Sequence, residues 1–326
     1  MLGPLLAMAL AKLLGANVAS PFGGRQAGQV VIGCALGLYF TPAVVGVLLA
    51  HAPLMLLAAV LAIALGYFCA YILSSIARID RTTALFASAP GGAAEMAVLG
   101  ERFGAAMDKV ALAQSLRIVL VIVVIPAALI YAGAHGTDQY RPAPGDVSYP
   151  GLALLLMLCV VAAFGLARFT LPNAWMLGPL AVGIIVTVTQ LELSAMPPVI
   201  SNLGQLLLGC ALGARFEQGL HKRAPRFLLG VVLSIAVAMA LSLLFALALA
   251  WLGGIPIPTM ILATAPGGIG EMGITAKVLQ LGVPLVTAFH VTRIVLLVTT
   301  TAPLFRVLQR FNGRVHHRKH GRRKSG

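Results

Sequence analysis

Long stretches without a charged residue constrain this chain more than any other feature. Residues 54–76 and 227–251 form uncharged runs of 23 and 25 residues, rich in Leu, Ala and Val. A helix needs roughly 20 mostly apolar residues to cross a bilayer, whereas the strands of a membrane barrel alternate apolar and polar side chains. Only 10% of the 326 residues are charged, against about 25% in soluble domains. The sequence therefore predicts an all-α, polytopic helical membrane protein.

An internal repeat divides the chain into two similar halves. At a shift of 176 residues, GQVVIGCALGLYF at 28–40 aligns with GQLLLGCALGARF at 204–216, with 8 of 13 positions identical. At the same shift, ASAPGGAAEM at 87–96 aligns with ATAPGGIGEM at 263–272, with 7 of 10 identical. The tetrapeptide LGPL also occurs twice, at 2–5 and 177–180. We therefore predict a duplicated membrane unit.

The predicted organisation follows from the repeat. Membrane repeat 1 covers 1–133, a polar linker loop covers 134–149, membrane repeat 2 covers 150–305, and a basic tail covers 306–326. Repeat 2 has a span at 150–168 before its LGPL segment, and we expect that the corresponding first helix of repeat 1 is missing. The predicted spans are 3–18, 27–46, 53–77, 109–133, 150–168, 174–191, 198–214, 226–252 and 283–306.

The distribution of basic residues predicts a topology. Eight of the 23 Lys and Arg residues lie at 306–324, and basic segments tend to stay in the cytoplasm. If 83–100 and 259–276 each enter and leave on one side, the basic loop at 215–226 also becomes cytoplasmic. This arrangement predicts inverted repeats with re-entrant helices and a cytoplasmic C-terminus. The alternative is an unwound helix that crosses completely.

The motif A-P-G-G-x-x-E-M predicts a broken helix in each repeat. Proline removes a main-chain donor and clashes with the preceding turn, and glycine releases the backbone from helical geometry. A half-helix is expected to start again near Ala93 or Ala94, with amide groups that favour an anion. The predicted main-chain site consists of Pro90, Gly91, Gly92, Pro266, Gly267 and Gly268.

Five charged or titratable side chains complete the predicted substrate or ion site. Glu95 and Glu271 would lie in the first turns of the half-helices, where a carboxylate is either functional or a cap of its own helix. Arg117 and Arg293 align at the 176-residue shift. They would snorkel to the membrane surface, pair with a glutamate, or bind an anion. His290 aligns with Gln114 and would relay protons or make a packing hydrogen bond.

No residue pattern predicts a metal, a cofactor or catalytic residues. The four cysteines at 34, 69, 159 and 210 lie in apolar runs and are expected to be packed free thiols. The histidines outside the basic segments are dispersed, which disfavours the ligand sets of metal oxygen chemistry. We therefore expect that the protein is not an enzyme.

The paired APGG-x-x-E-M and GQ-x-x-x-GCALG segments resemble the AbrB family of duplicated bacterial membrane proteins. That family is distinct from the small DNA-binding regulator of the same name. Its members have been labelled ammonia monooxygenases, and one has been tied to regulation of gene expression. The resemblance covers nearly the whole chain, apart from the family's first helix, which we expect this sequence to lack. It implies a multi-pass protein of the bacterial inner membrane.

Two functions remain open. The broken helices favour a secondary transporter or permease that moves a small polar or anionic solute, coupled to protons. The resemblance implies the alternative, a membrane-bound regulator of gene expression; a membrane monooxygenase is the least supported. The expected partners are membrane lipid, the solute or proton, and a second copy in a homo-oligomer. The basic tail lacks the interleaved aromatic residues of nucleic-acid binders, so no nucleic acid is expected.

Overall fold

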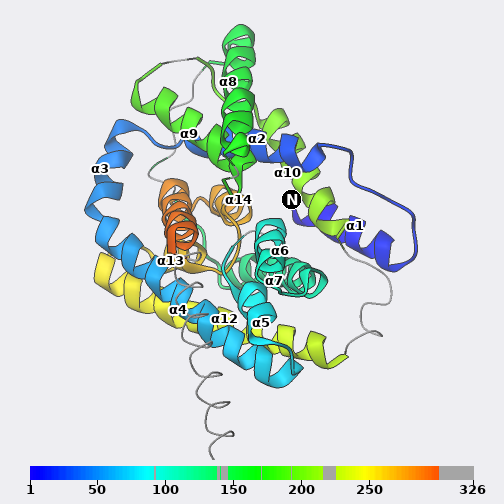
Figure 1. The fold of residues 1–326 in the computed structure, drawn as a ribbon. Coiled ribbons are helices and arrows are strands. Elements are labelled where there is room, and N and C mark those ends of the chain that lie inside the picture. The colour runs from blue at the N-terminus through cyan, green and yellow to red at the C-terminus, as the bar shows by residue number, and fades with distance from the viewer. Residues whose placement is uncertain are drawn as a thin grey trace, which may run out of the picture.

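The computed structural model is helical throughout the part of the chain that it describes, which comprises 1–91, 93–137, 140, 146–169, 171–191, 193–215 and 225–300, without the side chains of 93–95. Five of its helices are long and apolar enough to cross a membrane. They are α4 (Ala52–Ala77), α7 (Met107–Tyr131), α8 (Tyr149–Arg168), α12 (Pro225–Gly253) and the last helix, Val283–Thr300. The prediction of an all-α polytopic membrane protein is confirmed (Figure 1).

Three further apolar helices are shorter than a full span: α1 (Leu2–Leu13), α9 (Ala174–Val188) and α10 (Pro198–Gly213). The predicted span at 27–46 is wrong as one continuous helix. It is divided into α2 (Gly24–Gly37) and α3 (Pro42–Ala50), which meet at an angle of 87°. The break is local, because Thr41 caps α3 by accepting a hydrogen bond from the Val44 amide at 3.4 Å and Pro42 occupies the first turn.

The two APGG segments form the tips of helical hairpins. The first hairpin joins α5 (Arg81–Ser88) to α6 (Ala93–Arg102), and the second joins α13 (Ile257–Thr264) to α14 (Ile269–Leu279). In the first, the Ala106 amide donates to Thr83 Oγ1 at 2.9 Å, so the start of α5 lies beside the segment that leads from α6 into α7. In the second, a Cβ on Gly282 would lie 3.1 Å from the Thr259 methyl group. Each predicted broken segment therefore turns back on itself.

The helix starts recur at the spacing of the sequence repeat. The first residues of α5 and α13, of α6 and α14, and of α7 and the last helix are each 176 positions apart, at 81 and 257, 93 and 269, and 107 and 283. The predicted restart of a half-helix near Ala93 is confirmed. The duplication of the unit and the opposite orientation of its halves stay predictions.

Glycines allow the helices of the two halves to interlock. A Cβ on Gly33 or Gly37 of α2 would lie 2.5 or 2.6 Å from carbonyl oxygens of α9. A Cβ on Gly209 or Gly213 of α10 would lie 2.6 or 2.5 Å from carbonyl oxygens of Met1 and α1. Each GxxxG step therefore packs against the LGPL helix of the other half, with backbones in contact.

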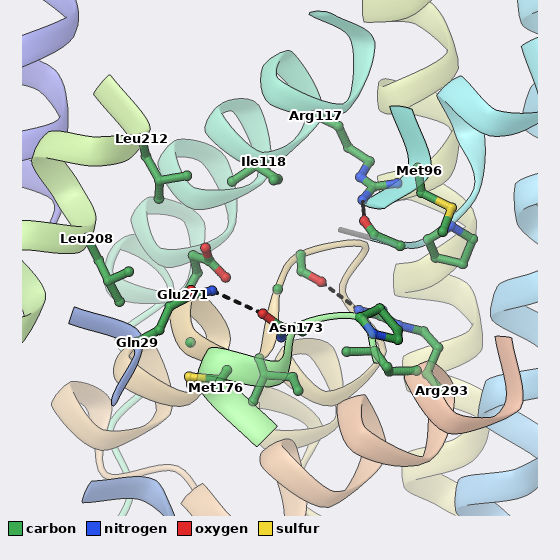
Figure 2. Close-up of a pocket in the computed structure, with 18 of the residues that line it drawn as sticks. Gln29, Met96, Arg117, Ile118, Asn173, Met176, Leu208, Leu212, Glu271 and Arg293 are labelled. Atoms are coloured by element: carbon green, nitrogen blue, oxygen red, sulfur yellow. Dashed lines mark hydrogen bonds between the residues drawn. The ribbon is translucent and has the colours of Figure 1, made fainter. Parts of the chain in front are cut away.

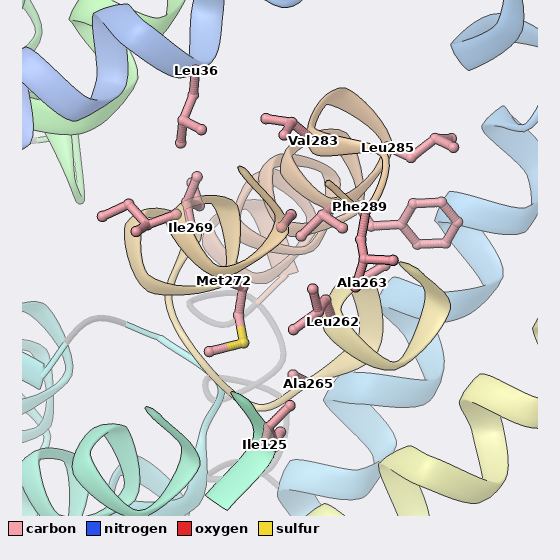
Figure 3. Close-up of a cluster of buried hydrophobic side chains, with 14 of the residues drawn as sticks. Leu36, Ile125, Leu262, Ala263, Ala265, Ile269, Met272, Val283, Leu285 and Phe289 are labelled. Carbon is pink, nitrogen blue, oxygen red and sulfur yellow. The ribbon is translucent and has the colours of Figure 1, made fainter. Parts of the chain in front are cut away.

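The remaining helices surround the hairpins. In Figure 1, α4 and α12 run side by side along one edge, and the Cys69 thiol of α4 lies 3.6 Å from the Ser234 carbonyl of α12. The main hydrophobic core gathers where α13, α14 and the last helix meet (Figure 3), with Leu262, Met272 and Phe289 almost fully buried. This packing fixes the second hairpin within the molecule.

The close contact of α2 with α9 predicts a difference between two glycines. Gly37→Ala places a methyl group against main-chain atoms, and we expect it to destabilise the fold by about 1–3 kcal/mol, as overpacking does. Gly46→Ala is the control, because nothing lies within 4 Å of its added Cβ. Thermal unfolding in detergent should show a lower midpoint for Gly37→Ala alone. Equal midpoints for the two variants would contradict the interlocked packing.

Candidate functional site

The tips of both hairpins line one cavity of about 90 Å³ (Figure 2). Pro90 and Gly91 come from the first tip, and Gly267 and Gly268 come from the second. The methionine of each motif packs on the first glycine of its own motif, because a Cβ on Gly91 would lie 2.7 Å from the Met96 side chain. Main-chain groups of both breaks are therefore held at the cavity by tight local packing.

An arginine holds each tip in the same way. Arg117 donates hydrogen bonds to the carbonyl oxygens of Ala89 at 2.7 Å and Gly91 at 2.9 Å. Arg293 donates to the carbonyl oxygens of Ala265 at 2.7 Å and Gly267 at 2.6 Å. The break leaves these carbonyls without helical partners, and a buried polar group needs a partner. The guanidinium fork satisfies two of them at once.

The two arginines lie in the interior. Arg117 is 6% exposed and Arg293 is 5% exposed, so the snorkelling interpretation of Arg117 is wrong. The physical reason is that the break offers two carbonyls without helical partners close to α7, and these replace water as the partners of the guanidinium group. The hydrogen bonds of both arginines go to main chain rather than to a described carboxylate.

His290 and Gln114 support the same segments one turn away. Gln114 Nε2 donates to the carbonyl oxygens of Phe86 at 2.7 Å and Ala89 at 2.9 Å. His290 Nε2 lies 3.0 Å from the carbonyl oxygen of Leu262, which aligns with Phe86. His290 is fully buried and is not among the described residues that line the cavity. The sequence left two interpretations of His290 open, a proton relay and a packing hydrogen bond. The contact with the Leu262 carbonyl fits the packing hydrogen bond.

Glu271 lies where it can cap the start of its own helix and also face the cavity. It lies in the first turn of α14, and its carboxylate folds over Gly268, where a Cβ would collide with it. That position suits the positive end of the helix. The same side chain lines the cavity, and Figure 2 places it across from Arg117 and Arg293.

Further polar residues complete the wall. Arg25 and Arg215 line the cavity and act electrostatically on Glu271, as Arg117 does. Gln29 Nε2 donates to Asn173 Oδ1 at 3.0 Å, joining α2 to the left-handed residue before α9. The rest of the wall is apolar and includes Ile118, Met176, Leu208 and Leu212.

The cavity brings together seven of the predicted residues: Pro90, Gly91, Gly267, Gly268, Glu271, Arg117 and Arg293. Pro266 lies on the other side of the second tip, in a separate small cavity. Gly92 and the side chain of Glu95 lie outside the described residues. Sequence reasoning missed Arg25, Arg215 and Asn173; the basic character of the segments flanking the GQ motifs was the available signal for the two arginines.

Of the four cysteines, Cys34 and Cys159 lie close together in one hydrophobic cluster. Cys34, Cys69 and Cys159 are buried and Cys210 is partly buried, all as free thiols, as predicted. Across the described ranges, no three His, Cys, Asp or Glu side chains gather in a way that could hold a metal ion.

Comparison with known proteins gives one family. The family model described as "Transition state regulatory protein AbrB" matches residues 1–309. The chain is 28% identical over 317 residues to "Uncharacterized protein YhjN" of Bacillus subtilis (strain 168), covering 90% of this chain and 80% of that protein. It is 25% identical over 314 residues to "Putative regulator AbrB" of Escherichia coli (strain K12), covering 95% and 90%. No solved structure matches.

The arginine hydrogen bonds predict that Arg293→Lys loosens the second tip. Lysine keeps the charge but cannot hold two carbonyls in a planar fork, and two unsatisfied carbonyls cost about 2–6 kcal/mol together. Hydrogen exchange measured by mass spectrometry should show faster exchange at 265–270. Arg226→Lys is the control, because Arg226 is exposed at the start of α12. Unchanged exchange in Arg293→Lys would show that the tip holds without this contact.

Proposed function

This chain belongs to the AbrB family, and we propose that it acts in the membrane as a secondary transporter or permease for a small anionic solute. The proposed binding site is the cavity between the two hairpin tips. Broken helices that place main-chain polar groups at membrane depth are a recurrent way to build a solute site in transporters. Such backbone is tolerated in a bilayer only where protein or a water-filled cavity satisfies it.

The charge of the cavity carries the proposal. Its described lining contains four arginines, at 25, 117, 215 and 293, and one carboxylate, Glu271. The start of α14 adds partial positive charge at the same place. A neutral or cationic solute would leave this excess of positive charge uncompensated. An anion would offset it, and guanidinium groups bind carboxylates and phosphates well.

The size and the apolar wall restrict the solute further. A cavity of about 90 Å³ accommodates a small molecule. Leu208, Leu212 and Met176 would contact carbon atoms, while the arginines would hold the acidic group. These features together support a short organic anion, such as a small carboxylate.

Glu271 is the proposed coupling residue. Among the described residues that line the cavity, Glu271 is the one that carries a carboxylate. Adding a proton to it would raise the positive charge of the site by one unit and so strengthen anion binding. An anion and a proton would then bind together and leave together. This coupling is the reason to expect proton flux with solute flux.

A regulatory role has weaker support. The word regulator belongs to the printed name of the Escherichia coli relative. The basic tail, through which such a role was expected to act, lies outside the described residues. Nothing in the described part of the chain favours the regulator over the transporter.

Proton flux in proteoliposomes tests the proposal. Purified protein is reconstituted into vesicles that contain a pH-sensitive dye, and a panel of acetate, lactate, succinate and citrate is added outside. We expect at least one anion to drive acidification above that of empty vesicles, and Glu271→Gln to reduce it at least 10-fold. Glu101→Gln should retain the flux, because Glu101 is exposed at the end of α6.

Two results would contradict the proposal. One is the absence of flux for every anion of the panel with protein that is correctly folded by thermal unfolding. The other is full proton-coupled flux in Glu271→Gln, which would remove the carboxylate from the mechanism.

A further inference from the structure

A second, smaller cavity of about 30 Å³ lies behind the hairpin tips. Pro90 and Pro266 contribute to it from the two tips, and Gly66 of α4 and Ser242 of α12 contribute from the outer layer. Arg117 and Arg293 line this cavity as well as the larger one. The two arginines therefore separate a larger cavity in front of the tips from a small enclosure behind them.

Three buried donors at this enclosure have no hydrogen-bond partner. They are Arg117 Nε, Arg293 Nε and the hydroxyl group of Ser88, and all three residues line the small cavity. The terminal nitrogens of each arginine are already engaged by main-chain carbonyls. Buried donors rarely stay unpaired in a native protein, so each calls for an explanation, such as an ion or a water molecule.

The enclosure also has an unbalanced charge. The two guanidinium groups are close enough to repel each other, and the described residues that line the cavity include no acidic side chain. The carbonyls that the arginines contact are dipoles and carry no net charge. Glu271 acts on Arg117 from the larger cavity, so one carboxylate faces two buried guanidinium groups, and a buried charge that lacks its own counter-charge is costly.

We propose that the enclosure binds a monovalent anion of halide size, held by Arg117 Nε, Arg293 Nε and the Ser88 hydroxyl group. The three groups are donors only, or rotate to donate, as an anion requires. A volume of about 30 Å³ exceeds the roughly 10–15 Å³ that one water molecule needs, which leaves room for a single small ion. One bound anion would offset the repulsion between the two arginines and join the two hairpin tips.

This site shares Arg117 and Arg293 with the proposed transport site but occupies a different cavity. It lies behind the tips, does not include Glu271, and requires no movement of solute. A water molecule in the same enclosure would satisfy the donors but would leave the excess of positive charge uncompensated, and the test distinguishes the two occupants.

Bromide is the probe, because it scatters anomalously and resembles chloride. Crystals of the full chain grown in sodium bromide should show an anomalous peak within hydrogen-bond distance of the three donors. In detergent, replacing sodium gluconate by sodium bromide at constant ionic strength should raise the unfolding midpoint with a saturable dependence on concentration. Ser88→Ala should weaken the apparent bromide affinity about 10-fold, as the loss of one hydrogen bond to a charged group implies.

Ser234→Ala is the matched control. Ser234 is also a buried serine, but it lines a neighbouring cavity and donates to the Cys69 carbonyl at 3.4 Å. We expect the Ser234→Ala variant to bind bromide with the same affinity as the unmodified protein. Because the Ser88 hydroxyl group has no partner, Ser88→Ala removes no existing hydrogen bond and should fold normally.

Three results would overturn the proposal: no anomalous peak in the enclosure, a peak only beside Glu271 in the larger cavity, or equal bromide affinities for Ser88→Ala and Ser234→Ala. Electron density for water without an anomalous signal would identify water as the occupant. Bromide binding in a protein that moves no solute would support this site and contradict the transport proposal, so the two fail independently.

Discussion

The hydrogen bonds from two buried arginines to the carbonyls of two helix breaks are the interaction on which the rest of the structure depends. A Pro-Gly interruption in a membrane protein leaves main-chain acceptors that lipid cannot satisfy. Arg117 and Arg293 provide the missing donors from the adjacent long helices. The breaks can therefore exist as sharp hairpin tips in the protein interior. The two terminal nitrogens of each guanidinium group bind two carbonyls of one tip and fix its geometry.

The same solution determines the electrostatics of the centre. Each arginine must stay charged and buried to hold its tip, and both line the cavities on either side of the tips. The interior consequently carries positive charge that a single described carboxylate, Glu271, opposes only in part. The proposed affinity for anions therefore rests on the same arginines that stabilise the backbone at the breaks.

Much of this arrangement could be predicted from the sequence, because Pro, Gly and the charge-free runs act locally. The breaks, the restart at Ala93 and the paired positions of the arginines all follow from such patterns. The bend between α2 and α3 was missed because the apolar run continues through it and only Thr41 and Pro42 mark it. Arg25 was missed for another reason: local patterns do not reveal which distant segments fold over a cavity.

The most direct measurement of the central claim is the charge preference of a cysteine placed in the larger cavity. Leu212→Cys, in a background without the four native cysteines, is exposed to an anionic and a cationic thiosulfonate of similar size in membrane vesicles. After correction for intrinsic reactivity, the account predicts faster modification by the anionic reagent. Equal rates, or a faster reaction with the cationic reagent, would contradict a cavity whose charge is set by buried arginines.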